Sequence, residues 1–547
     1  MAERLMGVET EYALSAMTEW HGGFDQTELL KKLFGVARRR LVHLPDVHGG
    51  MYLGNGSRFY IDYGNHPELT TPECTNPWDV VRYILAGERV LANLTEELER
   101  ELRECKLMLF KSNVDYGGTY VTWGCHESYL HRASPSAMSD EIIPHLVTRI
   151  IYTGAGGFDS VSRGFEFTLS PRVPHLANVV SNNSTSDRGI FHTKDESLSK
   201  PGYHRLHIIC GESLCSETGM WLKAATTALV VAMVEAGLHP GHGVGLRSPL
   251  QAMQTIAMDQ SCAKSVETTT GRRLSAIEIQ YHYLSMAEKH AGDPCMPAWA
   301  EEVCCKWRAM LNSLLDAPES VAANLDWAIK RSVYEGYANS KGVAWSSLPQ
   351  WTRVLQEVRQ VVDVGGEYDQ PLSAEHILNE WSTAKPAMKR LTEFTDRNGL
   401  SWDAIESVLK LREELFEIDT RFGQIGGQGI FASLDRAGVL KHHVPGVDNI
   451  EYAATHPPAA GRARVRGEVV RRLAGQNGYY KCDWQGVVDL VAKRVLDLSE
   501  PFESEERWLN LDEAQASSLS PFIELLSREG LRGDTTVWRS ASNCLAR

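Results

Sequence analysis

The alternation of polar and apolar positions between Asn55 and Cys74 predicts a half-buried strand followed by a polar turn. The two-residue period of a strand puts three polar side chains on one face, namely Arg58, Tyr60 and Asp62. After the turn, Glu68 and Glu73 stand on either side of a proline. Carboxylates gathered this densely repel one another unless a cation or a hydrogen-bond donor separates them. This segment alone is equally compatible with a cation site and with a solvated strand edge.

The same period predicts two further strands that carry ionisable residues. The strand from Leu5 to Ala13 places Glu9 and Glu11 on one face, which crowds like charges there. Both an exposed edge and a divalent-cation site remain open for these two acids. The strand from Arg205 to Cys210 places Arg205 and His207 on one face, opposite apolar residues.

Two shorter motifs each allow two interpretations. The adjacent His126 and Glu127 are interpreted as a pair satisfied within the core, in preference to a functional pair. The alternating arginines of GRARVRG predict a basic strand, formed by Arg462, Arg464 and Arg466. Such a strand is either solvated or a contact surface for phosphates or an acidic partner.

Helical periodicity dominates much of the remaining chain, with predicted helices at Gln26 to Leu41, Asp79 to Cys105 and Ser216 to Ala236, and over most of 275–415. Lys223 is the only cation in the hydrophobic helix that begins at Ser216, so it either snorkels or faces a site. The Gly-rich loop from Asp419 to Phe431 lacks the lysine and the Ser/Thr of a phosphate-binding P-loop. Residues from about 475 onward have the pattern of a small appended domain.

Composition narrows the class of protein. The chain has 547 residues, 43% of them hydrophobic, and a net charge of −14, which argues against a general binder of nucleic acid or anionic membrane. We see neither the apolar region of a signal peptide nor an apolar segment long enough to cross a bilayer. The eleven cysteines show no zinc-type spacing, so we expect free thiols in a reducing cytoplasm.

Taken together, the acids and the imidazole on these strands suggest a metal–nucleotide site. Mg²⁺ takes one or two carboxylates and keeps several waters, so four acids and one histidine suit two or more ions held with a nucleoside triphosphate. Arg205, beside His207, is placed to stabilise charge on a transferring phosphoryl group. Asp62 is then free to act as a base.

Five ordered segments resemble the signature segments of the bacterial Pup ligase and Pup deamidase/depupylase family: MGVETEY, NGSRFYIDYGNHPE with PEC, GCHESYL, HRLHIICGESLCSET and PPAAGRARVRG. This family is related to glutamine synthetase and other carboxylate–amine ligases. The resemblance implies an α+β fold in which a curved antiparallel sheet, packed by helices, cradles ATP and Mg²⁺. It implies a catalytic domain over residues 1–470, with a helical insert at about 340–415, and a small C-terminal domain over 471–547.

The resemblance also implies roles for individual residues. Those expected at the metal ions are Glu9, Glu11, Glu68 and Glu73, with His207 added by analogy with the related synthetases. Those expected to bind ATP are Glu9, Glu11, Arg58, Tyr60, Lys223 and Arg462. Asp62 matches the catalytic aspartate of the family, and Arg205 is expected to act beside it.

The implied activity is ligation of a Pup-like modifier to protein lysines. ATP would phosphorylate the side-chain carboxylate of the modifier's C-terminal glutamate, and a target lysine would then attack to form an isopeptide bond. The expected partners are therefore ATP, a small Pup-like modifier and lysine-bearing proteins, with no nucleic acid and no membrane.

The sequence favours the ligase branch, because the long polar insertion of the hydrolase branch before the NGxRxYxD strand is absent. The alternatives are a deamidase/depupylase, a divergent phosphotransferase acting on another substrate, and a nucleotide-binding pseudoenzyme. Three departures from the family keep them open. HTKDESL replaces an NTRDEPH-like segment, His204 replaces an arginine, and the region 342–415 is longer.

Overall fold

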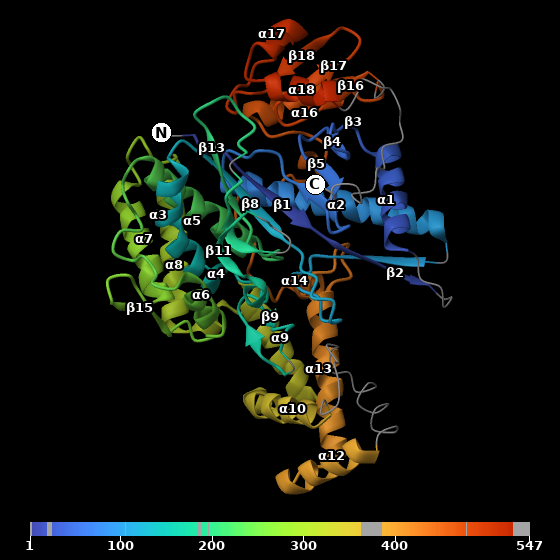
Figure 1. The fold of residues 1–547 in the computed structure, drawn as a ribbon, viewed down its shortest axis with the longest axis vertical. Coiled ribbons are helices and arrows are strands. Elements are labelled where there is room, and N and C mark those ends of the chain that lie inside the picture. Colours follow the sequence, from blue (N-terminus) through green and yellow to red (C-terminus); the bar gives the residue numbers. More distant parts are fainter. Residues whose placement is uncertain are drawn as a thin grey trace.

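The computed structural model describes residues 3–18, 25–103, 105–162, 164–182, 187–194, 196–362, 385–476 and 479–528. A nine-stranded sheet crosses the middle of the molecule (Figure 1). Its strands, in spatial order, are β11 (Asn178–Ser181), β12 (Gly189–His192), β13 (His204–Ile208), β8 (Cys125–His131), β1 (Met6–Glu11), β6 (Pro67–Thr70), β5 (Arg58–Ile61), β4 (Met51–Leu53) and β3 (His43–Pro45). Neighbouring strands are antiparallel except for β11 and β12, which are parallel.

The sheet has one apolar face and one polar face, because side chains alternate along each strand. On the central strand β1, Met6 and Val8 are buried in the main hydrophobic core, whereas Glu9 and Glu11 point the other way. Three helices pack beneath the apolar face: α2 (Pro77–Leu102), α3 (Pro135–Thr148) and α5 (Glu217–Glu235). The polar face is therefore the face available for chemistry.

The helix predicted to begin at Ser216 is α5, which is buried on all sides in the core. Ser216 caps it by accepting a hydrogen bond from the Gly219 amide, and Gly237 follows its end at a φ of 71°. The predicted helices at Gln26 and Asp79 are also present, as α1 (Gln26–Arg40) and α2. With β2 (Ala13–Thr18) and β7 (Cys105–Phe110), α1 and α2 enclose a second hydrophobic cluster.

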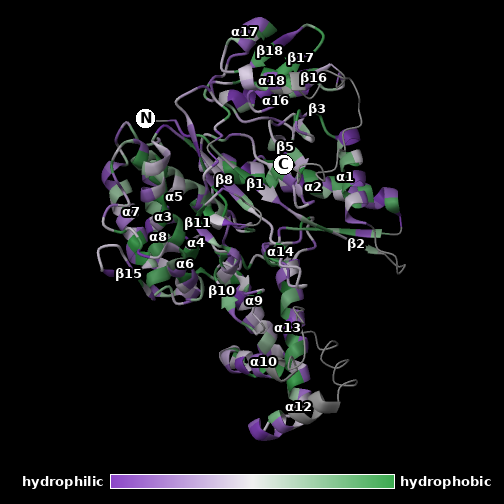
Figure 2. Ribbon diagram, in the orientation of Figure 1, coloured by the Kyte–Doolittle hydropathy of each residue, from purple (hydrophilic) through white to green (hydrophobic). Residues whose placement is uncertain are grey.

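A group of helices projects away from the sheet (Figure 1). They are α10 (Leu348–Val362), α12 (Lys385–Asn398) and α13 (Trp402–Phe422), reached from α9 (Asp326–Ser340). The described parts of the region 340–415 are thus mainly helical, and residues 363–384 of this predicted insert lie outside the described residues. In Figure 2, α12 is largely hydrophilic, whereas the helices against the sheet carry many hydrophobic residues.

The predicted basic strand GRARVRG is wrong, because it forms the start of helix α16 (Gly461–Leu473). Positions four apart share a helix face, so Arg462 and Arg466 both turn inward to Glu73, while Arg464 pairs with Glu468. The alternation has the period of a strand, but tertiary contacts with a buried carboxylate favour the helix.

A small antiparallel sheet follows α16, with strands β16 (Tyr480–Cys482), β17 (Gly486–Asp489), β18 (Arg494–Asp497) and β19 (Trp508–Asn510). Two short helices cover it, α17 (Leu511–Gln515) and α18 (Ser520–Arg528). Leu44 of β3 and Tyr52 of β4 share one cluster with residues of α16 and of this sheet. The predicted α+β class, with a helix-packed sheet and a small C-terminal unit, is confirmed. None of the described helices combines the length and the apolar character needed to cross a membrane.

Candidate active site

Strand register brings the predicted acids together in two rows on the polar face. Glu9 is paired with Thr70 on one side and His126 on the other, and Thr70 is paired with Arg58. In the next row, Glu11 is paired with Glu68, which is paired with Tyr60. Directly paired residues project to the same face of a sheet. Four segments that are distant in sequence therefore contribute to one surface.

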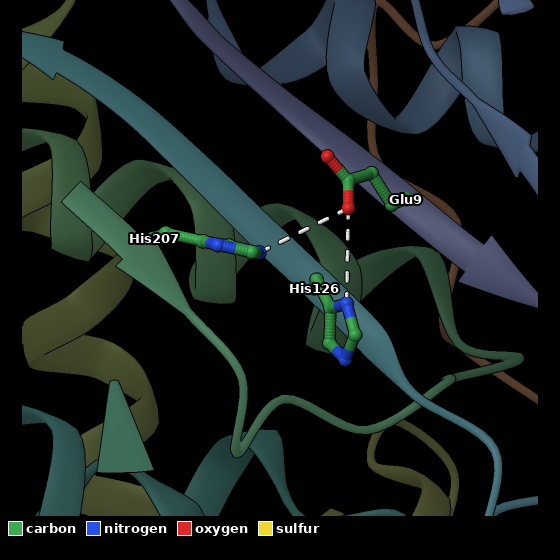
Figure 3. A group of neighbouring side chains, drawn as sticks. All are labelled: Glu9, His126 and His207. Carbon is green, nitrogen blue, oxygen red and sulfur yellow. Dashed lines mark ion pairs between the residues drawn. The ribbon is translucent and has the colours of Figure 1, made fainter. Parts of the chain in front are cut away.

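Glu9 lies at the centre of a group of nitrogen donors (Figure 3). Its Oε2 atom is 3.7 Å from His126 Nδ1 and 3.9 Å from His207 Nε2, and its Oε1 atom is 2.7 Å from a terminal nitrogen of Arg205. Within the described part of the chain, both ring nitrogens of His207 are buried without a hydrogen-bond partner. A buried imidazole costs free energy when its nitrogens are unsatisfied, so this ring is poised for a ligand.

The charges of this group favour metal binding. Burial, reinforced by the charge of Arg205, holds the pKa of His207 well below its ordinary 6.5, so the ring is neutral and offers a lone pair. Burial alone would raise the pKa of Glu9, but Arg205, His126 and His207 outweigh it and lower that pKa far below 4.5. The neutral ring of His207, the imidazole of His126 and one carboxylate are a donor set that binds divalent cations.

Glu68 is a buried acid among other acids. Its side chain is 4% exposed, and burial together with the charges of Glu9 and Glu11 raises its pKa well above 4.5. The pKa of Glu11 moves the other way, to about 2, because hydrogen bonds from His66 and the Gly124 amide outweigh the effect of burial. A cation between Glu9, Glu11 and Glu68 would relieve the repulsion that Glu68 experiences.

Asp62 is held by the turn that follows β5. Its Oδ1 accepts a hydrogen bond from the His66 amide at 2.6 Å, and its Oδ2 lies 3.1 Å from His66 Nδ1. The same ring nitrogen is 3.6 Å from Glu11 Oε2, and the two acids raise the pKa of His66 to about 9 in spite of burial. At Gly64, a Cβ would lie 2.7 Å from the His66 ring, so this turn requires glycine there.

Arg58 is placed by Asp46, whose Oδ2 lies 2.7 Å from Arg58 Nε. The Arg58 guanidinium stacks over the Tyr60 ring at 4.1 Å, which keeps both side chains beside the row of acids. Burial and the nearby Glu68 raise the pKa of Tyr60 well above 10, so its hydroxyl stays protonated.

A cavity of about 110 Å³ adjoins the Glu9 group at the start of β1. Its polar and aromatic lining residues include Glu9, Thr71, Glu73, Arg205, Arg462 and Trp484. An aromatic ring and two arginines around a small cavity suit a nucleotide base and its phosphates. The arginines were predicted from sequence, but Thr71 and Trp484 were not. Trp484 belongs to the C-terminal unit, which only the fold brings to the sheet.

Two predicted site residues lie in other surroundings. Glu73 is the counter-ion of two arginines, since its Oε1 is 2.6 Å from Arg462 Nε and its Oε2 pairs with Arg466. These arginines overcome the effect of burial and lower the pKa of Glu73 to about 2. The role of Glu73 as a metal ligand stays a prediction, and in this structure both of its oxygens are paired with guanidinium groups.

Lys223 is predicted to bind ATP, and the structure places it beneath the sheet instead. Its Nζ lies 3.2 Å from Cys125 Sγ and donates to the Glu212 carbonyl at 2.9 Å. Cys125 precedes His126, so its side chain points to the opposite, helix-covered face. Lys223 thus satisfies groups under the active face without reaching it.

The interpretation of His126 and Glu127 as one buried pair is wrong for His126. Glu127 is fully buried and its Oε1 lies 2.5 Å from Arg149, whereas His126 lies on the polar face with Glu9. Adjacent residues on a strand face opposite ways, and that alternation was a usable signal for His126. His66 was also missed, because its role depends on the turn that returns it to Asp62.

Comparison with known proteins identifies the family. The family model described as Pup-ligase protein matches residues 4–356 and 347–488. The chain is 29% identical to the Pup--protein ligase of Rhodococcus opacus (strain B4), an alignment that covers 92% of this chain and 97% of that protein. It is 30% identical to the Pup--protein ligase of Mycobacterium avium (strain 104), with the same coverage of both chains.

Solved structures agree on the fold. The ligase PafA in complex with the prokaryotic ubiquitin-like protein Pup superposes with a TM-score of 0.68 at 22% identity, covering 96% of this chain and 93% of that one. PafA in complex with ADP superposes with a TM-score of 0.62 at 21% identity, covering 94% and 97%. The predicted glutamine-synthetase-like fold is thereby confirmed. With a family model matched along most of its length, the chain belongs to the Pup-ligase family.

Proposed function

We propose that this protein is an ATP- and Mg²⁺-dependent ligase that joins the C-terminal glutamate of a Pup-like modifier to lysines of target proteins. The observation that carries the proposal is the order of groups along the polar face. The cavity with Arg462 and Trp484 adjoins the Glu9 group, and Asp62 lies beyond Glu11 on the other side. The relatives named Pup--protein ligase support the same activity.

The residues fit a metal-bound triphosphate. We assign Glu9, Glu11, Glu68, His207 and His126 to the ions, with Tyr60 beside them, and we assign the cavity to ATP. Bound Mg²⁺ would neutralise the negative charge of triphosphate and substrate carboxylate, which otherwise repel each other. Arg205, which bridges the cavity and Glu9, is placed to stabilise charge on the phosphoryl group in transfer.

The chemistry proceeds in two steps. The γ-phosphoryl group is transferred to the side-chain carboxylate of the glutamate, which forms an acyl phosphate and releases ADP. Asp62 then accepts a proton from the lysine ammonium, the amine attacks the acyl carbon, and phosphate leaves as the isopeptide bond forms. The hydrogen bonds from His66 orient the Asp62 carboxylate for this proton transfer.

The test is an ATP-turnover assay with Mg²⁺, with and without a glutamate-terminated modifier and a lysine-bearing protein. We expect a product whose mass equals modifier plus target minus one water. Asp62→Asn should lower the ligation rate by roughly 10²–10⁴-fold, the usual contribution of a general base. Asp403→Asn, on α13 and remote from the sheet, is the matched control.

The same assay separates the alternatives. Release of modifier or of ammonia, without ligation, would identify the hydrolase activity of the deamidase/depupylase branch. ATP-dependent phosphorylation of some other acceptor would identify a divergent phosphotransferase. Absence of turnover in every combination, with Asp62→Asn unchanged, would identify a pseudoenzyme. The ten described cysteines are all free thiols, and we propose a reducing, cytoplasmic location on that basis.

A further inference from the structure

Near the Glu11 end of the polar face, the guanidinium groups of two arginines lack a carboxylate partner within hydrogen-bonding distance among the described residues, although the Arg172 amide donates to Glu212 Oε1 at 2.9 Å. Arg172, just before the short helix η1 (Val173–His175), is 3% exposed, and its Nε is buried without a hydrogen-bond partner. One terminal nitrogen of Arg172 donates to the Gly211 carbonyl. Arg188, just before β12, is half-buried, and within the described residues its guanidinium makes neither an ion pair nor a hydrogen bond. An arginine removed from water without an anion is costly unless a ligand supplies one.

The backbone brings the two arginines to one place. The Arg188 carbonyl accepts from the Ala177 amide at 2.8 Å, and the His175 amide donates to the Arg172 carbonyl at 3.0 Å. His192 of β12, close by in the chain, has its ring 5.6 Å from that of His207 on the polar side. The charge of Glu11 acts on the pKa of Arg188, so the Arg188 guanidinium is within electrostatic reach of the acids of the polar face.

Backbone hydrogen bonds place Arg172 close to Glu11. One terminal nitrogen of Arg172 donates to the Gly211 carbonyl. The Gly211 carbonyl accepts from the Cys125 amide at 3.3 Å, and the neighbouring Gly124 amide donates to Glu11 Oε2 at 2.7 Å. Only a narrow strip of backbone thus separates Glu11 from Arg172.

That strip carries no side chain at Gly124. A Cβ there would lie 2.4 Å from His126 Nε2, so the position requires glycine. The His126 ring therefore packs directly against the backbone of this strip.

Electrostatics in this region point to a missing anion. Burial and the charge of Arg172 lower the pKa of Arg188, and burial with both arginines lowers the pKa of His175 to about 4. His175 is therefore neutral, with its Nε2 2.9 Å from Ser160 Oγ. Glu11 acts electrostatically on both arginines, and Glu212 acts on Arg172. Burial raises the pKa of Glu212.

The position of the pair selects which anion it binds. The cavity assigned to the nucleotide adjoins β1 between Leu5 and Glu9 and has its own arginines, Arg205 and Arg462. The pair of Arg172 and Arg188 lies toward the other end of the strand, near Glu11, on the side of Glu9 away from that cavity. A C-terminal glutamate has two carboxylates, and only its side-chain carboxylate meets the metal ligands.

We propose that Arg172 and Arg188 bind the main-chain α-carboxylate of the glutamate whose side chain is phosphorylated. This inference rests on the proposed ligase function and adds the reason why the modifier has to end in glutamate: the second carboxylate exists only at a C-terminus. Paired guanidinium groups match a planar carboxylate through charge-assisted hydrogen bonds.

The test compares two forms of one modifier, with a free terminal carboxylate and with a terminal amide, on the full-length wild-type protein and on Arg188→Gln. We expect amidation to lower wild-type kcat/KM by roughly 10- to 100-fold, the size expected when a charge-assisted hydrogen bond is lost. Arg188→Gln should lose a similar factor with the acid and then be insensitive to amidation. Its KM for ATP should be unchanged. Arg273→Gln, an exposed arginine of β15 (Arg273–Ser275), should behave as wild type.

Two results would overturn the inference. If wild type and Arg188→Gln discriminate equally between acid and amide, the α-carboxylate is bound elsewhere. If Arg188→Gln raises the KM for ATP, the arginines contact phosphate and not the substrate carboxylate. Circular dichroism and ADP binding of the variant establish that it is folded.

Direct binding separates this inference from the proposed function. A fluorescent peptide ending in glutamate is titrated onto the protein in the presence of ADP and Mg²⁺, with its amide as comparison. Binding that depends on both Arg188 and the free carboxylate supports the inference even if no ligation is observed. If ligation occurs at the same rate without Arg188 and without the free terminal carboxylate, the proposed ligase function stands and the inference is refuted.

Discussion

The two faces of the central sheet bury carboxylates in opposite ways, and His126 and Glu127 of β8 show the difference at adjacent positions. On the helix-covered face, the Glu127 carboxylate accepts hydrogen bonds from both terminal nitrogens of Arg149, at 2.5 and 2.9 Å, and from the Tyr129 hydroxyl at 2.7 Å. Burial would raise the pKa of Glu127, but Arg149 and Lys223 reverse the effect and lower it. On the polar face, Glu68 is buried next to other acids, and its pKa is raised.

The comparison teaches that burial alone does not distinguish a structural acid from a functional one. Glu127 is matched by partners within the chain, whereas Glu68 and His207 leave charge or lone pairs that a ligand has to match. These unmatched groups lower the free energy of unfolding of the ligand-free protein, and binding of the ligand raises it again.

A second cluster of histidines and acids sharpens this distinction. Glu217, Asp435, His442 and His443 lie together at the start of α5, and Glu217, His442 and His443 are spaced closely enough for a metal ion. Their nitrogens are satisfied, since His443 bonds Glu217 at 2.8 Å and Asp435 at 3.1 Å, and His442 Nδ1 accepts from the Glu217 amide at 3.3 Å. We therefore interpret it as an ion-pair network that joins α5 to the chain after α14 (Ile430–Arg436).

The largest effect is expected from breaking the matched pair. Arg149→Met leaves Glu127 buried without its counter-charge, and it should lower the free energy of unfolding by about 3–5 kcal/mol. Urea unfolding measures this. Arg39→Met, which removes an exposed ion pair with Glu101, is the control and should cost at most about 1 kcal/mol. Equal losses in the two variants would contradict the comparison.

A smaller effect is expected when Mg²⁺ and ADP bind at the polar face, where Glu68 lies among other acids and the ring nitrogens of His207 lack a hydrogen-bond partner within the described chain. Mg²⁺ with ADP at 100 times their dissociation constant should stabilise the wild-type protein by about 2.7 kcal/mol, because they bind only the folded state. Glu9→Gln should lose this stabilisation, as measured by denaturant unfolding with and without the ligands. His443→Gln, in the second cluster, should keep it. If His443→Gln alone lost the stabilisation, the metal would bind in the second cluster, which would contradict its assignment to the Glu9 group.

The smallest effect concerns pH in the metal-free protein. The folded pKa of Glu68 lies above its ordinary 4.5, so its contribution to stability is present at lower pH and is lost as pH rises through the raised value. A tenfold difference in proton affinity between the folded and unfolded states corresponds to about 1.4 kcal/mol. Glu68→Gln should abolish this loss in urea unfolding between about pH 5 and pH 9 with EDTA.

The pH dependence of stability expected from Glu73 has the opposite sign and serves as an internal check. Its pKa is lowered to about 2 by Arg466 and Arg462, so its contribution is present above pH 4.5 and is lost as pH falls toward 2. Glu73→Gln should therefore lower stability at neutral pH. Parallel pH profiles for the two variants would refute the assignment of matched and unmatched acids.

Sequence alone determined which residues share a face, because the two-residue alternation of a strand is a property of the local backbone. Glu9 with Glu11, Arg58 with Tyr60, and Arg205 with His207 are each found on the polar face as predicted. Signature motifs also identified the family, and with it the fold. The roles of individual site residues stay predictions until the variants are measured.

Only the tertiary structure decided how those faces meet. Strand register, set by pairing between residues as far apart in sequence as Glu9 and His126, brought His126 to Glu9, and the packing of α5 left Lys223 beneath the sheet. The inward contacts of Arg462 and Arg466 with Glu73 made a helix of a segment whose alternation predicted a strand. Long-range packing and charge pairing override local periodicity, because their free energies depend on partners that no local pattern contains.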